Sequence, residues 1–148
     1  MGEIKKKILT RICAAIISLI PFAILYVLTK TVFKGVYVFE WAMENSYIYL
    51  WIVIPVITLF DIKWGTVLSV ANIVCIIFGQ VYGQYKHDRN VALITPDMTV
   101  EQVYHLKEYS GVFDWIYSLL LIAVVYGIYR IVRYNIKKYK KKKADASV

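Results

Sequence analysis

The residues best suited to chemistry gather in one polar segment, 86–111. Carboxylate and imidazole side chains recur there at helical spacing, namely Asp97, Glu101, His105 and Glu108. If a helix begins by Asp97, these four fall within one arc of about 80° at ~100° per residue. Such a face could offer ligands to a divalent metal. A tight site, however, normally draws ligands from several directions and needs further supporting groups. We therefore interpret the set as a solvated face and predict no metal and no other cofactor.

A second polar group lies inside an apolar stretch. Asn72, Gln80 and Gln84 interrupt the charge-free residues 64–85. Polar side chains within a membrane usually face a partner or a cavity. Hydrogen bonds between helices are the simpler interpretation, and each would contribute about 0.6–2 kcal/mol. The alternative interpretation is a solute path along these three side chains.

The same stretch carries small residues spaced by four, namely Ala71, Cys75, Gly79 and Gly83. Gly79 and Gly83 form a GxxxG pair, which lets two helix backbones approach closely in lipid. The same spacing recurs elsewhere in two pairs, Ala14 with Ser18 and Ala123 with Gly127. The pattern predicts helix packing, either within one chain or between subunits.

The sequence lacks the residues and motifs that several kinds of catalysis require. No Asp, Glu, Lys, Arg or His lies in the middle of the apolar stretches, where proton-coupled transport usually needs one. The sequence contains no GxSxG, HExxH, P-loop or dinucleotide-binding motif. Two cysteines without a CxxC, Cys13 and Cys75, provide neither a dithiol site nor a zinc scaffold. We therefore predict that the chain is not an enzyme.

The elements that position these residues are apolar segments bounded by charges. The chain is 59% hydrophobic, against roughly 45–50% in typical globular domains. A bilayer core of ~30 Å needs about 20 helical residues. Four segments meet or approach this length, namely 8–30, 43–61, 64–85 and 112–135. The sequence thus predicts an all-α polytopic membrane protein, with a single membrane domain over 1–148.

Local signals refine this outline. Thr99 and Gln102 have the spacing of a capping box, and Ser110-Gly111 can end a helix. A short extracytoplasmic helix over about 100–109 is therefore expected between the third and fourth spans. Pro21 and Pro55 lie inside the first and second spans, and each removes a backbone hydrogen bond and can bend its helix.

Lysine and arginine set the orientation, because they are concentrated on cytoplasmic loops. They cluster before and at the start of the first span, at 5–11, and at the end of the last span and beyond it, at 130–143. Both termini are therefore expected in the cytoplasm, with the loop 86–111 outside.

The basic tail 136–148 can also bind anionic lipid. Nucleic acid is not an expected partner, since no folded domain accompanies these charges. The abundance of lysine, isoleucine and tyrosine indicates a bacterial source and hence the cell membrane.

Two functions fit these features. The first is a non-enzymatic accessory or interaction subunit of a larger membrane assembly, whose partners are other membrane proteins or further copies of itself. The alternative is a small oligomeric transporter or channel with a polar path along the third span. The sequence alone does not name a partner, a solute or a process.

Overall fold

Helices make up nearly all of the computed structural model, which describes residues 2–45 and 48–145 except the side chains of Ile48, Ala144 and Asp145. In chain order they are α1 (Gly2–Ile17), α2 (Ile20–Thr31), α3 (Tyr37–Glu44), α4 (Ile48–Phe60), α5 (Ile62–Val91), α6 (Val100–Lys107) and α7 (Gly111–Asp145). Within these described ranges there is no strand. The predicted all-α class is therefore confirmed.

Three helical segments are long and apolar enough to cross a membrane. They are α1 with α2 over Gly2–Thr31, α5 over Ile62–Val91, and α7 over Gly111–Lys143. They cover the first, third and fourth predicted spans. The membrane character predicted from the composition is thus supported by helices of sufficient length.

The first span is interrupted between α1 and α2. Backbone hydrogen bonds continue through the interruption, since the Ser18 and Leu19 N–H groups donate to Ala14 and Ile16 carbonyls. Pro21 lies in the first turn of α2, where its missing N–H group would have had no helical partner. The other proline, Pro55, lies inside α4, and that helix continues through it without a break.

The second predicted span, 43–61, is not one continuous helix. The helix α3 ends at Glu44 and α4 begins at Ile48, with their axes 78° apart and residues 46–47 outside the described part. The prediction of a continuous helix is therefore wrong. The 13 residues of α4 extend only about 20 Å at 1.5 Å per residue. Because α3 buries Val38, Phe39 and Ala42, it packs against its neighbours instead of extending α4.

The helices α5 and α7 are longer than predicted. The Asp61 side chain caps α5 by accepting hydrogen bonds from the Lys63 and Trp64 N–H groups. The same helix continues to Val91, so residues 86–91 of the predicted extracytoplasmic loop are helical. No proline or glycine follows Gly83 until Pro96, so nothing in the sequence ends the helix earlier. The helix α7 runs on through the basic tail to Asp145, and residues 146–148 of the predicted tail lie outside the described part.

The predicted short helix is present as α6. The Thr99 hydroxyl accepts from the Gln102 N–H group at 3.3 Å, and the Gln102 side chain accepts from the Thr99 N–H group at 2.9 Å. This reciprocal pair is the capping box that the spacing predicted.

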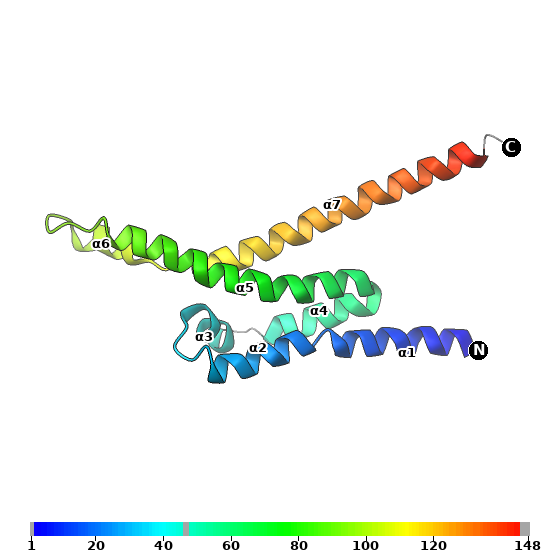
Figure 1. Cartoon of the computed structure of the whole chain (residues 1–148), viewed down its shortest axis with the longest axis horizontal. Coiled ribbons are helices and arrows are strands. Elements are labelled where there is room, and N and C mark those ends of the chain that lie inside the picture. The colour runs from blue at the N-terminus through cyan, green and yellow to red at the C-terminus, as the bar shows by residue number, and fades with distance from the viewer. Residues whose placement is uncertain (1, 46–47, 146–148) are drawn as a thin grey trace.

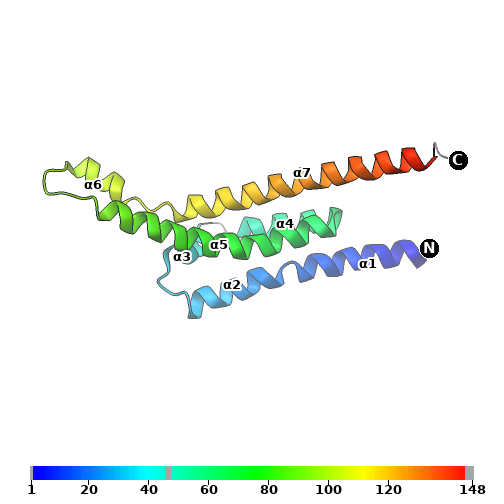
Figure 2. The same ribbon diagram turned by 45° about the horizontal axis from the view of Figure 1, so that its top comes forward.

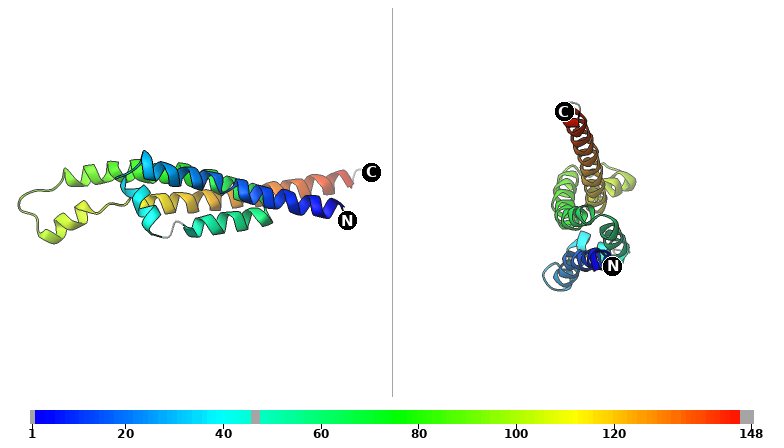
Figure 3. Two further views of the ribbon diagram at one scale, coloured as in Figure 1. Left: turned by 90° about the horizontal axis from the view of Figure 1, so that it is seen from below. Right: turned by 90° about the vertical axis from the view of Figure 1, so that its right-hand side faces the viewer.

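The helices form an elongated and open arrangement. The start of α1, the α4–α5 turn and the end of α7 lie toward one end, which we call the terminal end (Figure 1). The helices α3 and α6 lie at the opposite end, which we call the loop end (Figure 2). Viewed end-on, α7 lies at one edge and α1–α2 at the other, with α5 and α4 between them (Figure 3). The central helix α5 therefore contacts both α4 and α7.

Candidate functional site

The small residues of α5 lie against the start of α7. A Cβ atom built on Gly79 would lie 2.5 Å from the Gly111 carbonyl oxygen, and one built on Gly83 would collide with the Gly111 Cα atom. Ala71 and Cys75 continue this buried face of α5. The structure thus places Ala71, Cys75, Gly79 and Gly83 on a buried face, with the two glycines in a helix contact inside one chain.

Two of the three polar residues of the suggested solute path take part in contacts between elements. Asn72 is only 1% exposed, and its Oδ1 atom accepts a hydrogen bond from Trp115 Nε1 at 3.1 Å. The Gln80 side chain accepts from the Val38 N–H group at 3.0 Å, which ties α3 to α5. Gln84 is exposed, and its amide donates to Asp88 one turn further along the same helix. The structure therefore does not bring the three side chains to one surface.

An ionic and hydrogen-bonded cluster reinforces the same contact at the loop end. Lys86 pairs with Asp114 at 2.7 Å, and the Ser110 hydroxyl donates to the same carboxylate at 2.9 Å. The Tyr109 hydroxyl donates to the Gln80 carbonyl. Burial, reinforced by the negative charge of Asp114, raises the pKa of Tyr109, so this phenol stays a hydrogen-bond donor at neutral pH. The cluster therefore fixes how α5 and α7 meet.

The acidic residues of the 86–111 segment do not share one helical arc. The helix α6 begins at Val100 with Thr99 as its N-cap, so Asp97 lies in the preceding turn and Glu108 at the C-cap. The helix therefore does not begin by Asp97, and the condition for one shared arc is not met. All four residues, Asp97, Glu101, His105 and Glu108, are exposed. Among the described residues, no three His, Cys, Asp or Glu side chains are grouped so that they could hold a metal ion.

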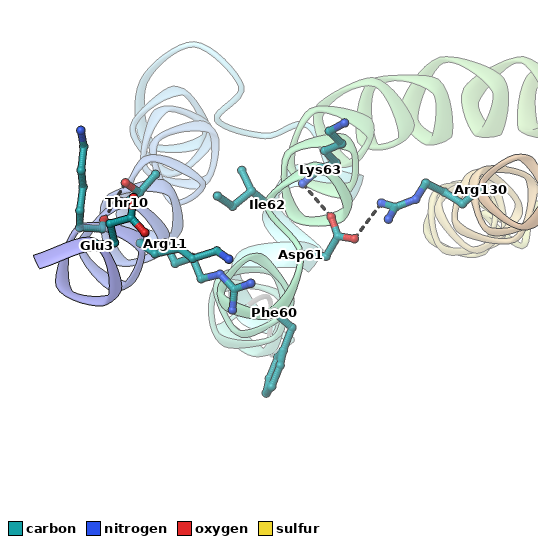
Figure 4. Close-up of a pocket in the computed structure, with 10 residues that line it drawn as sticks. Glu3, Thr10, Arg11, Phe60, Asp61, Ile62, Lys63 and Arg130 are labelled. Carbon is teal, nitrogen blue, oxygen red and sulfur yellow. Dashed lines mark hydrogen bonds and ion pairs between the residues drawn. The ribbon is translucent and has the colours of Figure 1, made fainter. Parts of the chain in front are cut away.

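A cleft at the terminal end brings together residues that are far apart in the sequence. We call it the basic cleft, and its volume is about 760 Å³. Its cationic lining consists of Lys6, Lys7 and Arg11 from α1, Lys63 from the start of α5, and Arg130 from α7. Its acidic lining consists of Glu3 and Asp61. Figure 4 shows Arg11 extending from α1 toward the α4–α5 turn, while Arg130 meets Asp61 from the other side. The cleft is thus strongly cationic.

The acidic residue at the centre of the cleft is already neutralised. The Asp61 carboxylate lies 2.8 Å from an Arg130 guanidinium nitrogen and caps α5 through the Lys63 and Trp64 N–H groups. Burial acts to raise the pKa of Asp61, but the capping hydrogen bonds and Arg130 outweigh it and leave this pKa below its ordinary value. Asp61 therefore stays ionised and holds Arg130 in place.

A smaller cavity adjoins the basic cleft on the α7 side. Its volume is about 230 Å³, and it shares Lys63 and Arg130 with the cleft. Its other lining residues come from the next turns of α7, namely Tyr126, Tyr129, Arg133, Tyr134 and Lys137. The positive surface therefore continues from α1 across the α4–α5 turn onto α7.

In the sequence these cations indicate the orientation of the chain, and Lys137 of the tail also indicates lipid binding, but no pattern there predicts that they converge. The sequence signal was present but ambiguous, because Asp61 is the one acidic residue at the boundary of the second and third spans, and Arg130 lies near the end of the fourth span. Comparisons with protein-family models, curated proteins and solved structures give no match to this chain. The site must therefore be interpreted from its own geometry.

Proposed function

We propose that this chain is a non-enzymatic, multi-pass protein of the cell membrane that serves as an accessory or interaction subunit of a larger membrane assembly. The observation that carries this proposal is the small buried share of α7. Only 17% of its most apolar stretch is buried within the chain, against 44% for α5. An apolar helix that packs on one side leaves a long face for lipid and for a partner helix.

The proposed orientation has both termini in the cytoplasm and four crossings. The end of α2 lies at the loop end, whereas α5 begins at the terminal end (Figure 1). The chain must return between these points, and the broken pair α3–α4 provides that return. The lysines and arginines at the terminal end support a cytoplasmic location for it.

The alternative, an oligomeric channel or transporter with a path along α5, has less support. Asn72 and Gln80 already take part in hydrogen bonds between elements, and Gln84 bonds within its own helix. Hydrogen bonds of this kind contribute to helix packing in membranes. A solute path would have to compete with those contacts.

The test is purification of the tagged full chain from native membranes in mild detergent. We expect one partner protein at fixed stoichiometry. Substituting Val124→Trp and Ile128→Trp on the exposed face of α7 should release it, because bulky rings obstruct close helix packing. The matched control is Val70→Trp with Val74→Trp, which alters an exposed face of α5 at the same spacing. A homo-oligomer that supports solute flux in liposomes would contradict the proposal and favour the channel.

A further inference from the structure

We propose that the basic cleft binds the phosphate headgroup of an anionic phospholipid. Basic pockets between transmembrane helices at the membrane surface recognise such headgroups. The proposal requires that the chain lies in a membrane, and it does not depend on the role of the chain in an assembly. The site is also distinct from the lysine tail of α7, which carries charge but does not line the cleft.

Most cations of the basic cleft have no acidic partner. Among the described residues the ion pairs are Lys86–Asp114 and Arg130–Asp61. The Lys6, Lys7, Arg11 and Lys63 side chains therefore have no described carboxylate within 4 Å. Asp61 is occupied by Arg130 and by the start of α5, so Glu3 is the only other acidic residue in the lining. The cleft thus presents several cations that a phosphate could neutralise.

The cations of the basic cleft come from three different helices. Lys6 and Lys7 of α1 are adjacent and Arg11 follows four positions after Lys7, so these cations extend over successive turns of one helix. Across the cleft, Lys63 and Arg130 come from two other helices. Arg130 is held by its 2.8 Å contact with Asp61. Cations from three helices therefore surround one space, unlike the lysine tail, which is a single helix.

Apolar side chains near the basic cleft favour a lipid as the source of the phosphate. Between and beyond its cations, α1 exposes aliphatic side chains at Ile8, Ile12 and Ile16. Phe60, which lines the cleft, is 78% exposed, and in Figure 4 its ring points away from the charged groups. A headgroup in the cleft would thus have an apolar surface beside it for its acyl chains. A soluble phosphate would gain nothing from that surface.

The experiment uses the purified full chain in a neutral detergent, with native mass spectrometry of bound lipid. The site variant is Lys6→Gln with Lys7→Gln and Arg11→Gln. The matched control is Lys140→Gln with Lys141→Gln and Lys142→Gln, which removes the same charge from the tail. At ~1 kcal/mol for each basic residue, the site variant should bind phosphatidylglycerol roughly 100-fold more weakly than the wild type. The tail variant should bind it as the wild type does, and phosphatidylcholine should not bind.

Two further measurements keep the test decisive. Circular dichroism should show unchanged helix content in both variants, because all six substituted side chains are exposed. Inorganic phosphate, added as a competitor, should not displace the lipid. Wild-type lipid binding by the site variant would overturn the proposal, as would equal losses in both variants. Displacement by inorganic phosphate would assign the cleft to a soluble anion and also overturn it.

Discussion

At the scale of single residues, the close approach of α5 and α7 depends on glycines, which have no side chain. Gly79 and Gly83 of α5 face Gly111, the first residue of α7, with no room for a Cβ atom on any of the three. Because backbone atoms of the opposing helix occupy that room, a rotamer change cannot relieve an added methyl group. The two helices would have to separate, which also affects the Trp115–Asn72 hydrogen bond nearby.

Replacing Gly83 with alanine should therefore destabilise the protein. We expect a loss of about 1–3 kcal/mol in the free energy of unfolding, as for other overpacked interiors. Gly127→Ala is the matched control, since a Cβ atom there would lie 3.5 Å from the Trp64 ring, an ordinary contact. That control should keep or raise stability, because alanine favours helix by about 1 kcal/mol over glycine. Denaturation in detergent, followed by circular dichroism, measures both; equal effects would show that α5 and α7 do not meet at Gly83.

The small and polar residues of α5 could be identified from the sequence as packing candidates, but their partners could not. A spacing of four marks one face of a helix without stating what lies opposite. Gly111 faces Gly79 and Gly83, and the Val38 N–H group donates to Gln80. Nothing in the sequence marks Gly111 or Val38 as these partners. These contacts join residues more than 25 positions apart, and one sequence carries no record of such pairings.

At the scale of elements, the α4–α5 turn is the point where three helices are held together. Asp61 is the one residue between α4 and α5. It caps α5 and pairs with Arg130 of α7. A single carboxylate therefore connects the start of α5 with α7. Gly65, one turn into α5, packs directly against Thr58 of α4, so the hairpin is close as well as capped.

This arrangement predicts how stability changes with pH. The folded pKa of Asp61 lies below its ordinary value of 3.8, so ionised Asp61 stabilises the folded chain above that pH. This contribution should be lost as the pH falls below 3.8 and passes through the lower folded pKa. In Asp61→Asn the cap remains, because asparagine also caps helices, but the charge does not. We expect the wild type to lose more stability than Asp61→Asn between about pH 5 and pH 2, as measured by unfolding in detergent.

The same comparison has a clear failing outcome. If both proteins lose stability equally over that range, Asp61 has the same pKa in the folded and unfolded chain and its pairing with Arg130 contributes nothing. Glu3→Gln is a useful control, since Glu3 also lines the cleft but has no ion pair within the described chain. Its acid response should match that of the wild type.

Three of the four apolar segments correspond to long helices because their signal is simple. An uninterrupted charge-free stretch must satisfy its backbone internally in lipid, and a helix does so. The second segment gave a weaker signal, since Glu44 divides its apolar residues. Hydrophobicity alone predicts one helix over 43–61. In the structure, residues 43–44 belong to α3, which is held against the rest of the chain by its buried residues Val38, Phe39 and Ala42. That choice depends on tertiary packing, which periodicity does not encode.

At the scale of the whole molecule, the helices form a row more than a closed bundle. The end-on view in Figure 3 places α1–α2 and α7 on opposite edges of the α4–α5 pair. At the terminal end this leaves space between α1 and α7, which the basic cleft occupies. The convergence of α1, α5 and α7 residues follows from this overall arrangement. The sequence shows these cations, but their proximity depends on tertiary structure.

The orientation of the whole chain leads to the last prediction. Lysine and arginine at the terminal end favour the cytoplasm, so α6 at the loop end should face the outside. In a chain carrying Cys13→Ser and Cys75→Ala, a cysteine introduced as Val100→Cys should react with an impermeant thiol reagent in intact cells. Val100 is 88% exposed, so access is not limited by the fold. Lys141→Cys, at the other end, should react only after the cells are permeabilised.

The pair of labels distinguishes the possible arrangements. Labelling of both positions in intact cells would place the two ends of the molecule on the outer side, which would mean that α7 does not cross the membrane. Labelling of position 141 alone would mean that the whole chain is inverted. Because α7 is the one long apolar segment between these positions, opposite labelling of 100 and 141 would establish that α7 crosses the membrane. Protection of position 100 in intact cells, with labelling after permeabilisation, would contradict the proposed orientation and the cytoplasmic location of the basic cleft.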